Sequence, residues 1–187
     1  MNTFLIIVVI LVIVIVAIIS IYNTLVAKKN QVSNISAGVD TQLKKRYDLI
    51  PNLVAAVKEY LIHEKETLQK VTELRNLAMA AKNNGEKFEL NNQISKLLGG
   101  IFVAVEAYPN LKANENVLHL QRTLTEVEEQ LSAARRAYNS SVMDYNNACE
   151  MFPTNIVASL FNFEKREFFE ASDSEKTTPN VSELFKK

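Results

Sequence analysis

Hydrophobic residues follow two different patterns along this chain. From Phe4 to Ile21 they form one apolar run that only Ser20 interrupts, whereas from Val32 onward they recur every three or four residues. A run of 18 residues forms a helix of about 27 Å, close to the ~30 Å hydrocarbon core of a bilayer. Spacings of three and four predict amphipathic helices. The pattern therefore predicts a membrane-spanning helix followed by a helical bundle.

A cleaved signal peptide is the alternative interpretation of the apolar run. Such a peptide begins with basic residues and ends at a small-x-small cleavage site, and neither Asn2-Thr3 nor Asn23-Thr24 supplies these features. We therefore favour a permanent anchor that contacts the lipid bilayer through Phe4 to Ile21. Lys28 and Lys29 follow the run and no Lys or Arg precedes it. The positive-inside rule then predicts an outside N-terminus and a cytoplasmic bundle.

Four periodic segments follow the anchor, separated by breaks that contain Pro, Asn or Gly. Pro51 predicts the first break because it lacks a backbone N–H, and Asp48 is positioned to cap the helix that follows. Residues 83–85 (Asn-Asn-Gly), Pro109 and Pro153 end the later segments. Because short connections favour antiparallel neighbours, we predict an all-α fold: an N-terminal transmembrane helix and an antiparallel up-down bundle of about four long helices. A membrane-tethered coiled-coil dimer is the alternative, although its helices would be interrupted too often.

The domain organisation follows from these patterns. We assign residues 1–27 to the anchor, 28–163 to the bundle domain and 164–187 to an amphipathic, flexible C-terminal tail. Because no apolar stripe includes the anchor, we expect its removal to take away no core contact. The last stripe is the most regular and contains Val117, Leu120, Leu124, Val127, Leu131, Ala134, Tyr138, Val142, Tyr145, Cys149 and Phe152.

Composition narrows the functional classes. The chain has 21 Lys plus Arg and 21 Asp plus Glu, so it lacks the cationic excess that phosphate-tracking nucleic-acid binding needs. A single cysteine, Cys149, excludes an internal disulfide and a thiolate metal site. We therefore expect no nucleic-acid partner.

Candidate catalytic motifs are incomplete. His63-Glu64 begins like a zinc-protease helix, but position 67 is Thr instead of the second His. The sequence also has no phosphate-binding glycine loop and no Gly-x-Ser-x-Gly elbow. We therefore expect no catalytic residue, no metal and no cofactor, and classify the chain as a non-enzyme.

Two further features concern polar residues on apolar helix faces. Glu64 stands at the missing stripe position between Leu61 and Leu68, where burial would require a cationic partner such as Arg75, Arg135 or Arg136. Tyr138-Asn139 and Tyr145-Asn146 repeat seven residues apart, which directs both phenol rings into a helix seam. We interpret these pairs as packing residues whose hydroxyls require hydrogen-bond partners.

Several motifs carry a family resemblance. They include residues 22–26 (YNTLV), 39–54 (VDTQLKKRYDLIPNLV), 106–116 (EAYPNLKANEN) and 135–139 (RRAYN). In this order they resemble the LemA family of bacterial membrane-anchored helical proteins. The resemblance implies one N-terminal span and an antiparallel bundle of about four helices, and it brings no assigned activity. The family motifs contain more polar groups than folding alone requires, and the candidate interaction or structural positions are Asp40, Arg46, Asp48, Asn52, Glu64, Glu106, Asn114, Arg135, Tyr138 and Asn146.

Two functional hypotheses follow. The first is a membrane-anchored scaffold that docks a protein partner through the connections at 48–52 and 108–116, because connections often carry recognition. The second is a small-molecule-binding protein or metal-dependent hydrolase, with Glu64 and Glu106 brought together inside the bundle. The sequence leaves homo-oligomerisation open.

Overall fold

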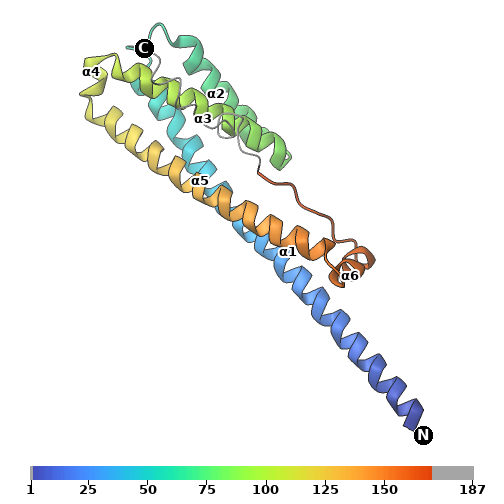
Figure 1. The fold of residues 1–187 in the computed structure, drawn as a ribbon. Helices are drawn as coiled ribbons and strands as arrows, with labels where there is room; N and C mark the ends of the chain where they lie inside the picture. Colours follow the sequence, from blue (N-terminus) through green and yellow to red (C-terminus); the bar gives the residue numbers. More distant parts are fainter. Residues whose placement is uncertain (1, 170–187) are drawn as a thin grey trace, which may run out of the picture. The chain divides into compact units, whose positions relative to one another are not determined.

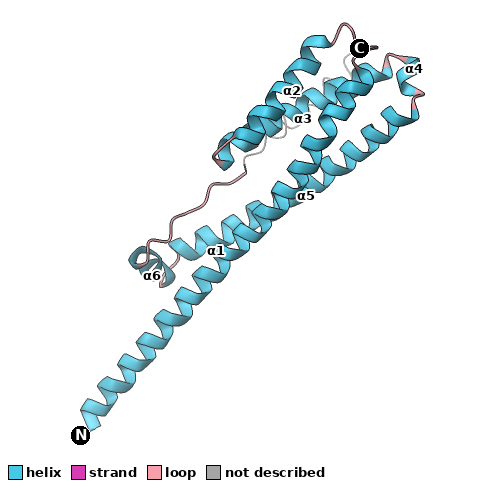
Figure 2. Ribbon diagram, turned by 180° about the vertical axis from the view of Figure 1, so that it is seen from behind, coloured by secondary structure: helices cyan, strands magenta, loops and turns pink. Residues whose placement is uncertain are grey.

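The computed structural model describes residues 2–169, and these form helices without any β-strand (Figures 1 and 2). The predicted all-α class is confirmed. Four helices are long and two are short. They are α1 (Asn2–Val57), α2 (Lys65–Ala80), α3 (Asn84–Glu106), α4 (Pro109–Lys112), α5 (Glu115–Glu150) and α6 (Thr154–Leu160). Most of the predicted tail, residues 170–187, lies outside the described part of the chain.

The chain divides into two compact units. The first unit contains Met1–Leu43 and Gln130–Phe168, and the second contains Lys44–Glu129 together with Phe169. Helices α1 and α5 each contribute residues to both units.

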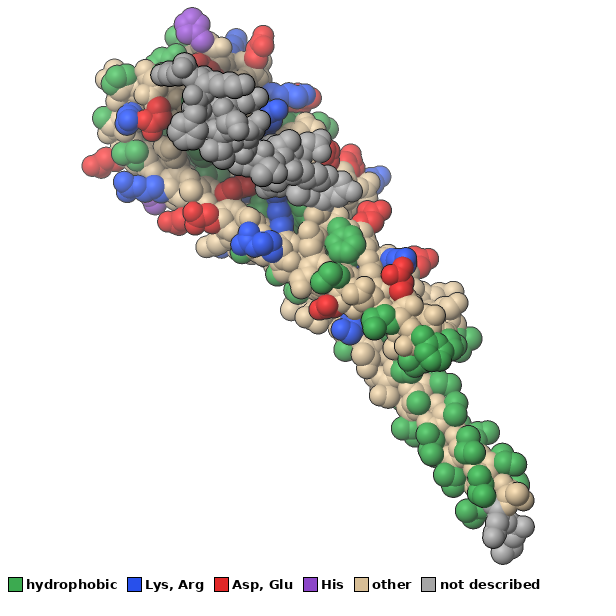
Figure 3. All heavy atoms as spheres, in the orientation of Figure 1, with side chains coloured by type: hydrophobic (Ala, Val, Ile, Leu, Met, Phe, Trp, Pro, Cys, Tyr) green, Lys and Arg blue, Asp and Glu red, His purple; other side chains and the backbone are tan. Residues whose placement is uncertain are grey.

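Helix α1 carries the apolar run. Among the described residues it is the one helix long and apolar enough to cross a membrane, and its most apolar 18-residue stretch has a mean hydropathy of 3.8. None of that stretch is buried within the protein, and hydrophobic side chains cover the N-terminal arm (Figure 3). A candidate membrane-spanning helix is therefore present at the predicted position.

The predicted helix break at Pro51 is wrong, because α1 continues through Pro51 to Val57. A proline at this position leaves the carbonyl of Tyr47, four residues earlier, without its helical donor. Arg75 of α2 supplies the missing hydrogen bond, since its Nε donates to the Tyr47 carbonyl oxygen at 2.6 Å. Leu53 on the same helix is fully buried. Packing and a replacement donor thus keep the helix intact where local propensity predicts its end.

The α2–α3 connection also differs in detail from the prediction. Gly85 was expected to end the second helix, but α2 ends earlier, at Ala80, and Gly85 lies in the first turn of α3. Asn83 is the N-cap of α3, and its side-chain oxygen accepts a 2.7 Å hydrogen bond from the Glu86 N–H. The Asn-Asn-Gly sequence therefore begins a helix, consistent with the preference of Asn for N-cap positions.

The core of the first unit includes residues next to the apolar run. Leu25 has no exposed surface and lies in a cluster with Val157 and Ala158 of α6. Ile21 and Phe163 pack against the same cluster. Removing residues 1–27 would therefore remove core contacts, and the expectation that the anchor is dispensable for packing is wrong. The sequence pattern does not show this boundary, because hydrophobic residues occur both in the exposed apolar run and at the buried position of Leu25 just beyond it.

Phe152 also departs from its predicted place in the stripe. Its side chain is 80% exposed, whereas Tyr145, two turns earlier in the stripe, is buried. The reason is that α5 ends at Glu150, so the helical periodicity no longer directs the side chains that follow.

Candidate functional site

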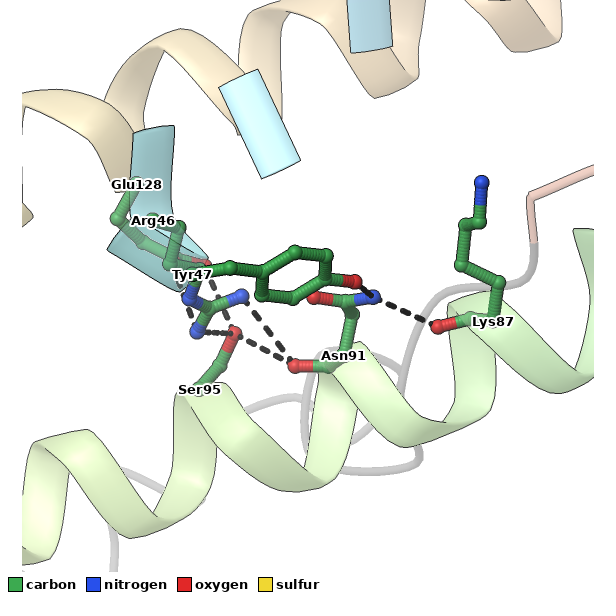
Figure 4. A network of polar contacts seen from close by, with 6 residues as sticks. All are labelled: Arg46, Tyr47, Lys87, Asn91, Ser95 and Glu128. Atoms are coloured by element: carbon green, nitrogen blue, oxygen red, sulfur yellow. Dashed lines mark hydrogen bonds and ion pairs between the residues drawn. The ribbon is translucent and has the colours of Figure 1, made fainter. Parts of the chain in front are cut away.

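A buried arginine is the centre of a polar network in the second unit (Figure 4). Arg46 of α1 is 1% exposed. Its Nη2 lies 3.0 Å from a carboxylate oxygen of Glu128 on α5 and donates to the hydroxyl of Ser95 on α3 at 2.7 Å. The Ser95 hydroxyl in turn lies 2.9 Å from the second oxygen of Glu128. One guanidinium group thereby connects three helices.

Asn91 extends the network along α3. Its side-chain NH2 group donates to the Tyr47 hydroxyl at 2.6 Å and to the backbone carbonyl of Lys87 at 2.8 Å. The backbone carbonyl of Asn91 accepts a 3.4 Å hydrogen bond from Arg46. Asn91 has no exposed surface. Arg46 and Asn91 are buried, whereas the Glu128 side chain is 40% exposed, so the network joins three helices from the core to the surface.

Arg46 is among the residues predicted from the sequence, whereas its partners Asn91, Ser95 and Glu128 are not. A signal for Asn91 was present, because it stands between Phe88 and Ile94 on the apolar face of the third periodic segment. A polar residue at such a position requires a buried partner. Ser95 follows it by four residues and therefore shares its helix face.

The predicted polar positions do not gather into one site. Asp40, Arg135, Tyr138 and Asn146 belong to the first unit, whereas the other six belong to the second. Asp48 and Asn52 are exposed on α1, inside a helix instead of an interhelical turn, and Asp48 pairs with Lys44 at 2.9 Å. Asn114 caps the start of α5, its side-chain oxygen accepting hydrogen bonds from the N–H groups of Asn116 and Val117.

In the first unit, polar side chains of α5 bind the backbone of residues 164–167. The hydroxyls of Tyr138 and Tyr145 donate to the carbonyls of Glu167 and Glu164 at 3.1 and 2.9 Å. The Asn146 amide both donates to and accepts from the backbone of Arg166, each at 2.9 Å. The side chains of the repeated Tyr-Asn pattern thus hold a segment without regular secondary structure against α5.

Burial and the neighbouring Cys149 thiol raise the pKa of the Tyr145 phenol to about 12. The neutral phenol is the form that donates to the Glu164 carbonyl. Burial explains this shift, and a phenol with such a high pKa does not ionise near neutral pH.

The two carboxylates considered for catalysis have different environments. Glu106 is exposed and pairs with Lys112 at 2.5 Å. One carboxylate oxygen of Glu64 is buried without a hydrogen-bond partner among residues 2–169. Arg75, a proposed partner of Glu64, instead binds the Tyr47 carbonyl and Asn76. No group of three or more His, Cys, Asp or Glu side chains within the described chain is placed to hold a metal ion.

An open groove lies where α1 is followed by α2 in the second unit. Its volume is about 510 Å³. Exposed Ile62 contributes to its apolar wall, and charges of both signs lie around it. The lining residues are Val54, Lys58, Glu59, Ile62, Lys65, Leu68, Gln69 and Thr72. The sequence does not predict this groove, because the helix break expected at Pro51 lies at least six residues before the actual α1–α2 connection.

Comparisons with known proteins identify relatives of this chain. The model of the LemA family matches residues 35–182. Protein LemA of Metamycoplasma hominis is 28% identical over 163 residues, which cover 87% of this chain and 74% of the relative. Magnetosome protein MamQ 2 of Paramagnetospirillum magneticum is 23% identical, and magnetosome protein MamQ of Magnetospirillum gryphiswaldense is 22% identical; each match covers 86% of this chain and 70% of the relative. Because the family model matches most of the chain, the protein belongs to the LemA family.

Proposed function

We propose that this protein is a non-enzymatic, membrane-anchored docking module whose groove between residues 54 and 72 binds a segment of a partner protein. The groove is the observation that carries the proposal, because its walls between α1 and α2 are largely apolar and open to solvent. Ile62 is 70% exposed beside it. A partner that covers an exposed apolar side chain removes its surface from water, which favours binding.

The chemistry of the groove favours a peptide with one apolar face. Val54, Ile62 and Leu68 provide apolar contacts, while Lys58 and Glu59 can pair with charges of either sign. This combination is typical of grooves that receive an amphipathic helix. Mixed charge at the rim disfavours a polyanionic ligand.

The anchor in this proposal is the N-terminal part of α1. Tyr22 packs edge-on against Phe161 and Phe163, with ring centroids 4.9 and 5.7 Å apart, and Leu25 is fully buried. Helix α1 therefore continues from the apolar run directly into folded structure, as a retained single-pass anchor requires. Lys28 and Lys29 favour an outside N-terminus and a cytoplasmic second unit.

Site-specific photocrosslinking in intact membranes tests the groove. A photoreactive residue at Ile62 should give a discrete adduct with one protein, and the same residue at Leu77 of α2, which is exposed outside the groove, should not. Gln69→Trp should abolish the Ile62 adduct by filling the groove, with an unchanged circular dichroism spectrum. Adducts of Ile62 with lipid alone, or a pattern shared with Leu77, would overturn the proposal, and self-adducts alone would indicate homo-oligomerisation instead.

A small-molecule-binding or hydrolytic role retains one supporting observation, the unpartnered carboxylate oxygen of Glu64. Such an oxygen could accept a hydrogen bond from a ligand or bind a cation. Elemental analysis of the purified protein, together with the phenotype of Glu64→Gln, tests this role. Stoichiometric metal that Glu64→Gln loses would support the hydrolase, while a metal-free protein and an unchanged phenotype would exclude it.

A further inference from the structure

Helix α6 lies beside α1 at the end of the apolar run. Its residues Val157 and Ala158 cluster with Leu25, and Ile21 packs against the same cluster. Both views show α6 next to α1 (Figures 1 and 2). Leu25 is four residues beyond Ile21, which corresponds to about 6 Å along a helix axis. All these residues belong to the first unit, so their placement is internal to one compact body.

The element around α6 exposes several large apolar side chains and no charged one. Phe152 is 80% exposed and Leu160 is 69% exposed, and Met151, Ile156 and Phe161 are also exposed. No charged residue occurs from Met151 to Phe163. Hydrophobic side chains also gather on the first unit just beyond the apolar arm (Figure 3). Helix α6 therefore buries Val157 and Ala158 against α1 and leaves Ile156 and Leu160 exposed.

The position of this surface identifies what covers it. The headgroup layers add roughly 5 to 8 Å to each side of the hydrocarbon core, so an element about 6 Å beyond the end of a span lies in that layer. Aromatic residues favour the same depth, and Tyr22, Phe161 and Phe163 form an aromatic group there. Lys29 lies close by, its Nζ 5.8 Å from the centre of the Phe163 ring. Cations at this level attract anionic headgroups.

We propose that residues 151–161 form a second membrane contact, in which α6 lies in the interfacial layer and inserts Phe152, Ile156 and Leu160 beside the α1 span. Ile156 and Leu160 are four residues apart and share one face of α6. The partner is the lipid bilayer surface, because α6 packs against Ile21 at the end of the α1 span and exposes its other apolar side chains there. The inference rests on the proposed membrane anchoring by α1 and is independent of the groove.

Fluorescence of the full-length protein in proteoliposomes tests this contact. Single cysteines at Phe152 and Leu160, in a Cys149→Ala background, carry an environment-sensitive fluorophore in phosphatidylcholine–phosphatidylglycerol vesicles. We expect lipids brominated in the acyl chain to quench both labels. A label at Met143, which is exposed on α5 in the same unit, should stay unquenched. Phe152 and Leu160 labels that behave like Met143 would overturn the proposal.

Two controls separate the remaining explanations. A label at Val12 within the apolar run should be quenched strongly, and loss of this signal would contradict the α1 span itself. Protection of the Phe152 and Leu160 labels from aqueous iodide without lipid quenching would indicate a protein contact, including a second copy, and would overturn the lipid assignment.

A charge substitution provides a second test that does not depend on a label at the substituted site. Leu160→Asp changes an exposed side chain and leaves the Leu25 cluster in place. It should reduce lipid quenching at Phe152 severalfold, whereas Ser159→Asp, an exposed polar position on the same helix, should change it little. Equal quenching in the two variants would contradict insertion of Leu160.

Discussion

The two units differ in the contacts that their polar side chains make. In the first unit, Tyr138, Tyr145 and Asn146 bind the backbone of residues 164–167. In the second, Arg46, Glu128 and Ser95 bind one another through their side chains, and Arg46 also donates to the backbone carbonyl of Asn91. Any residue supplies a backbone carbonyl, but few can replace a guanidinium or a carboxylate. The first unit should therefore tolerate substitution of the segment that it holds, whereas the second depends on particular residue types on three helices.

Leu131→Asp is expected to have the largest effect. Leu131 is fully buried on the α5 seam of the first unit, and an unpaired charge there costs several kcal/mol against a typical total stability of about 5 to 15 kcal/mol. A urea melt followed by circular dichroism should show loss of the cooperative transition. Met143→Asp, at an exposed position of the same helix, should melt like the parent. Parent-like melting of Leu131→Asp would contradict the assigned core.

Glu128→Ala should produce the next largest loss, in the second unit. It removes the carboxylate that lies 3.0 Å from the buried Arg46 guanidinium. We expect a decrease of about 3 kcal/mol in the free energy of unfolding, at the lower end for a broken buried pair because the Glu128 side chain is 40% exposed. Glu129→Ala, at the exposed neighbouring position, is the control. Equal urea midpoints for the two variants would show that the network adds little stability.

Two N-terminal deletions test where the candidate membrane span ends and the core of the first unit begins. A chain of residues 21–187 keeps the Leu25 cluster, whereas residues 28–187 lack it. Loss of a buried leucine alone costs about 2 to 5 kcal/mol, so the shorter chain should be less stable by at least about 2 kcal/mol in urea melts. Leu25→Ala in the longer chain should reproduce much of the loss. Identical stability of both chains would restore the view that the first 27 residues contribute no core.

Asn146→Ala tests the backbone-binding mode directly. The substitution leaves the N–H and carbonyl of Arg166 without their side-chain partner, and we expect a loss of about 1 to 3 kcal/mol. Hydrogen exchange should accelerate at residues 164–167. Arg166→Ala should have little effect, because Asn146 contacts only backbone atoms of this residue through these two bonds. A larger loss of stability in Arg166→Ala than in Asn146→Ala would show that the first unit depends on the Arg166 side chain and not on its backbone.

The smallest expected effect concerns pH. The Tyr145 phenol has a pKa of about 12, above the ordinary value of 10.0. Folding favours the neutral form, so its contribution to stability is complete below pH 10 and is lost as the pH rises toward 12. An ultraviolet titration of the phenolate should show a high-pH step that Tyr145→Phe removes. If all tyrosines titrate together near pH 10, the phenol is not buried as described.

The regular parts of the fold could be predicted from the sequence alone. Stripe residues such as Val39, Leu43 and Val142 are buried as their spacing predicts, since helical periodicity is a local property. The path of α1 through Pro51 could not be predicted, because it depends on Arg75, which is 24 positions away in the sequence.

The network around Arg46 shows the same limit at the candidate site. Its polar character was visible, but Ser95 and Glu128 are identified only when three helices are brought together. The family motifs include Arg46 but do not predict which residues it contacts. The groove was missed for a related reason, since its position follows from where α1 actually ends.

Pro51 helps to fix the axial register between α1 and α2. Apolar stripes repeat with every turn, so two helices that slide past each other by one turn can bury nearly equivalent surfaces. The carbonyl of Tyr47 breaks this equivalence, because Pro51 makes it the one acceptor on this part of α1 that lacks a helical donor. Arg75 can satisfy it in one alignment only. A residue usually regarded as a helix breaker thereby selects one register and excludes its near-degenerate competitors.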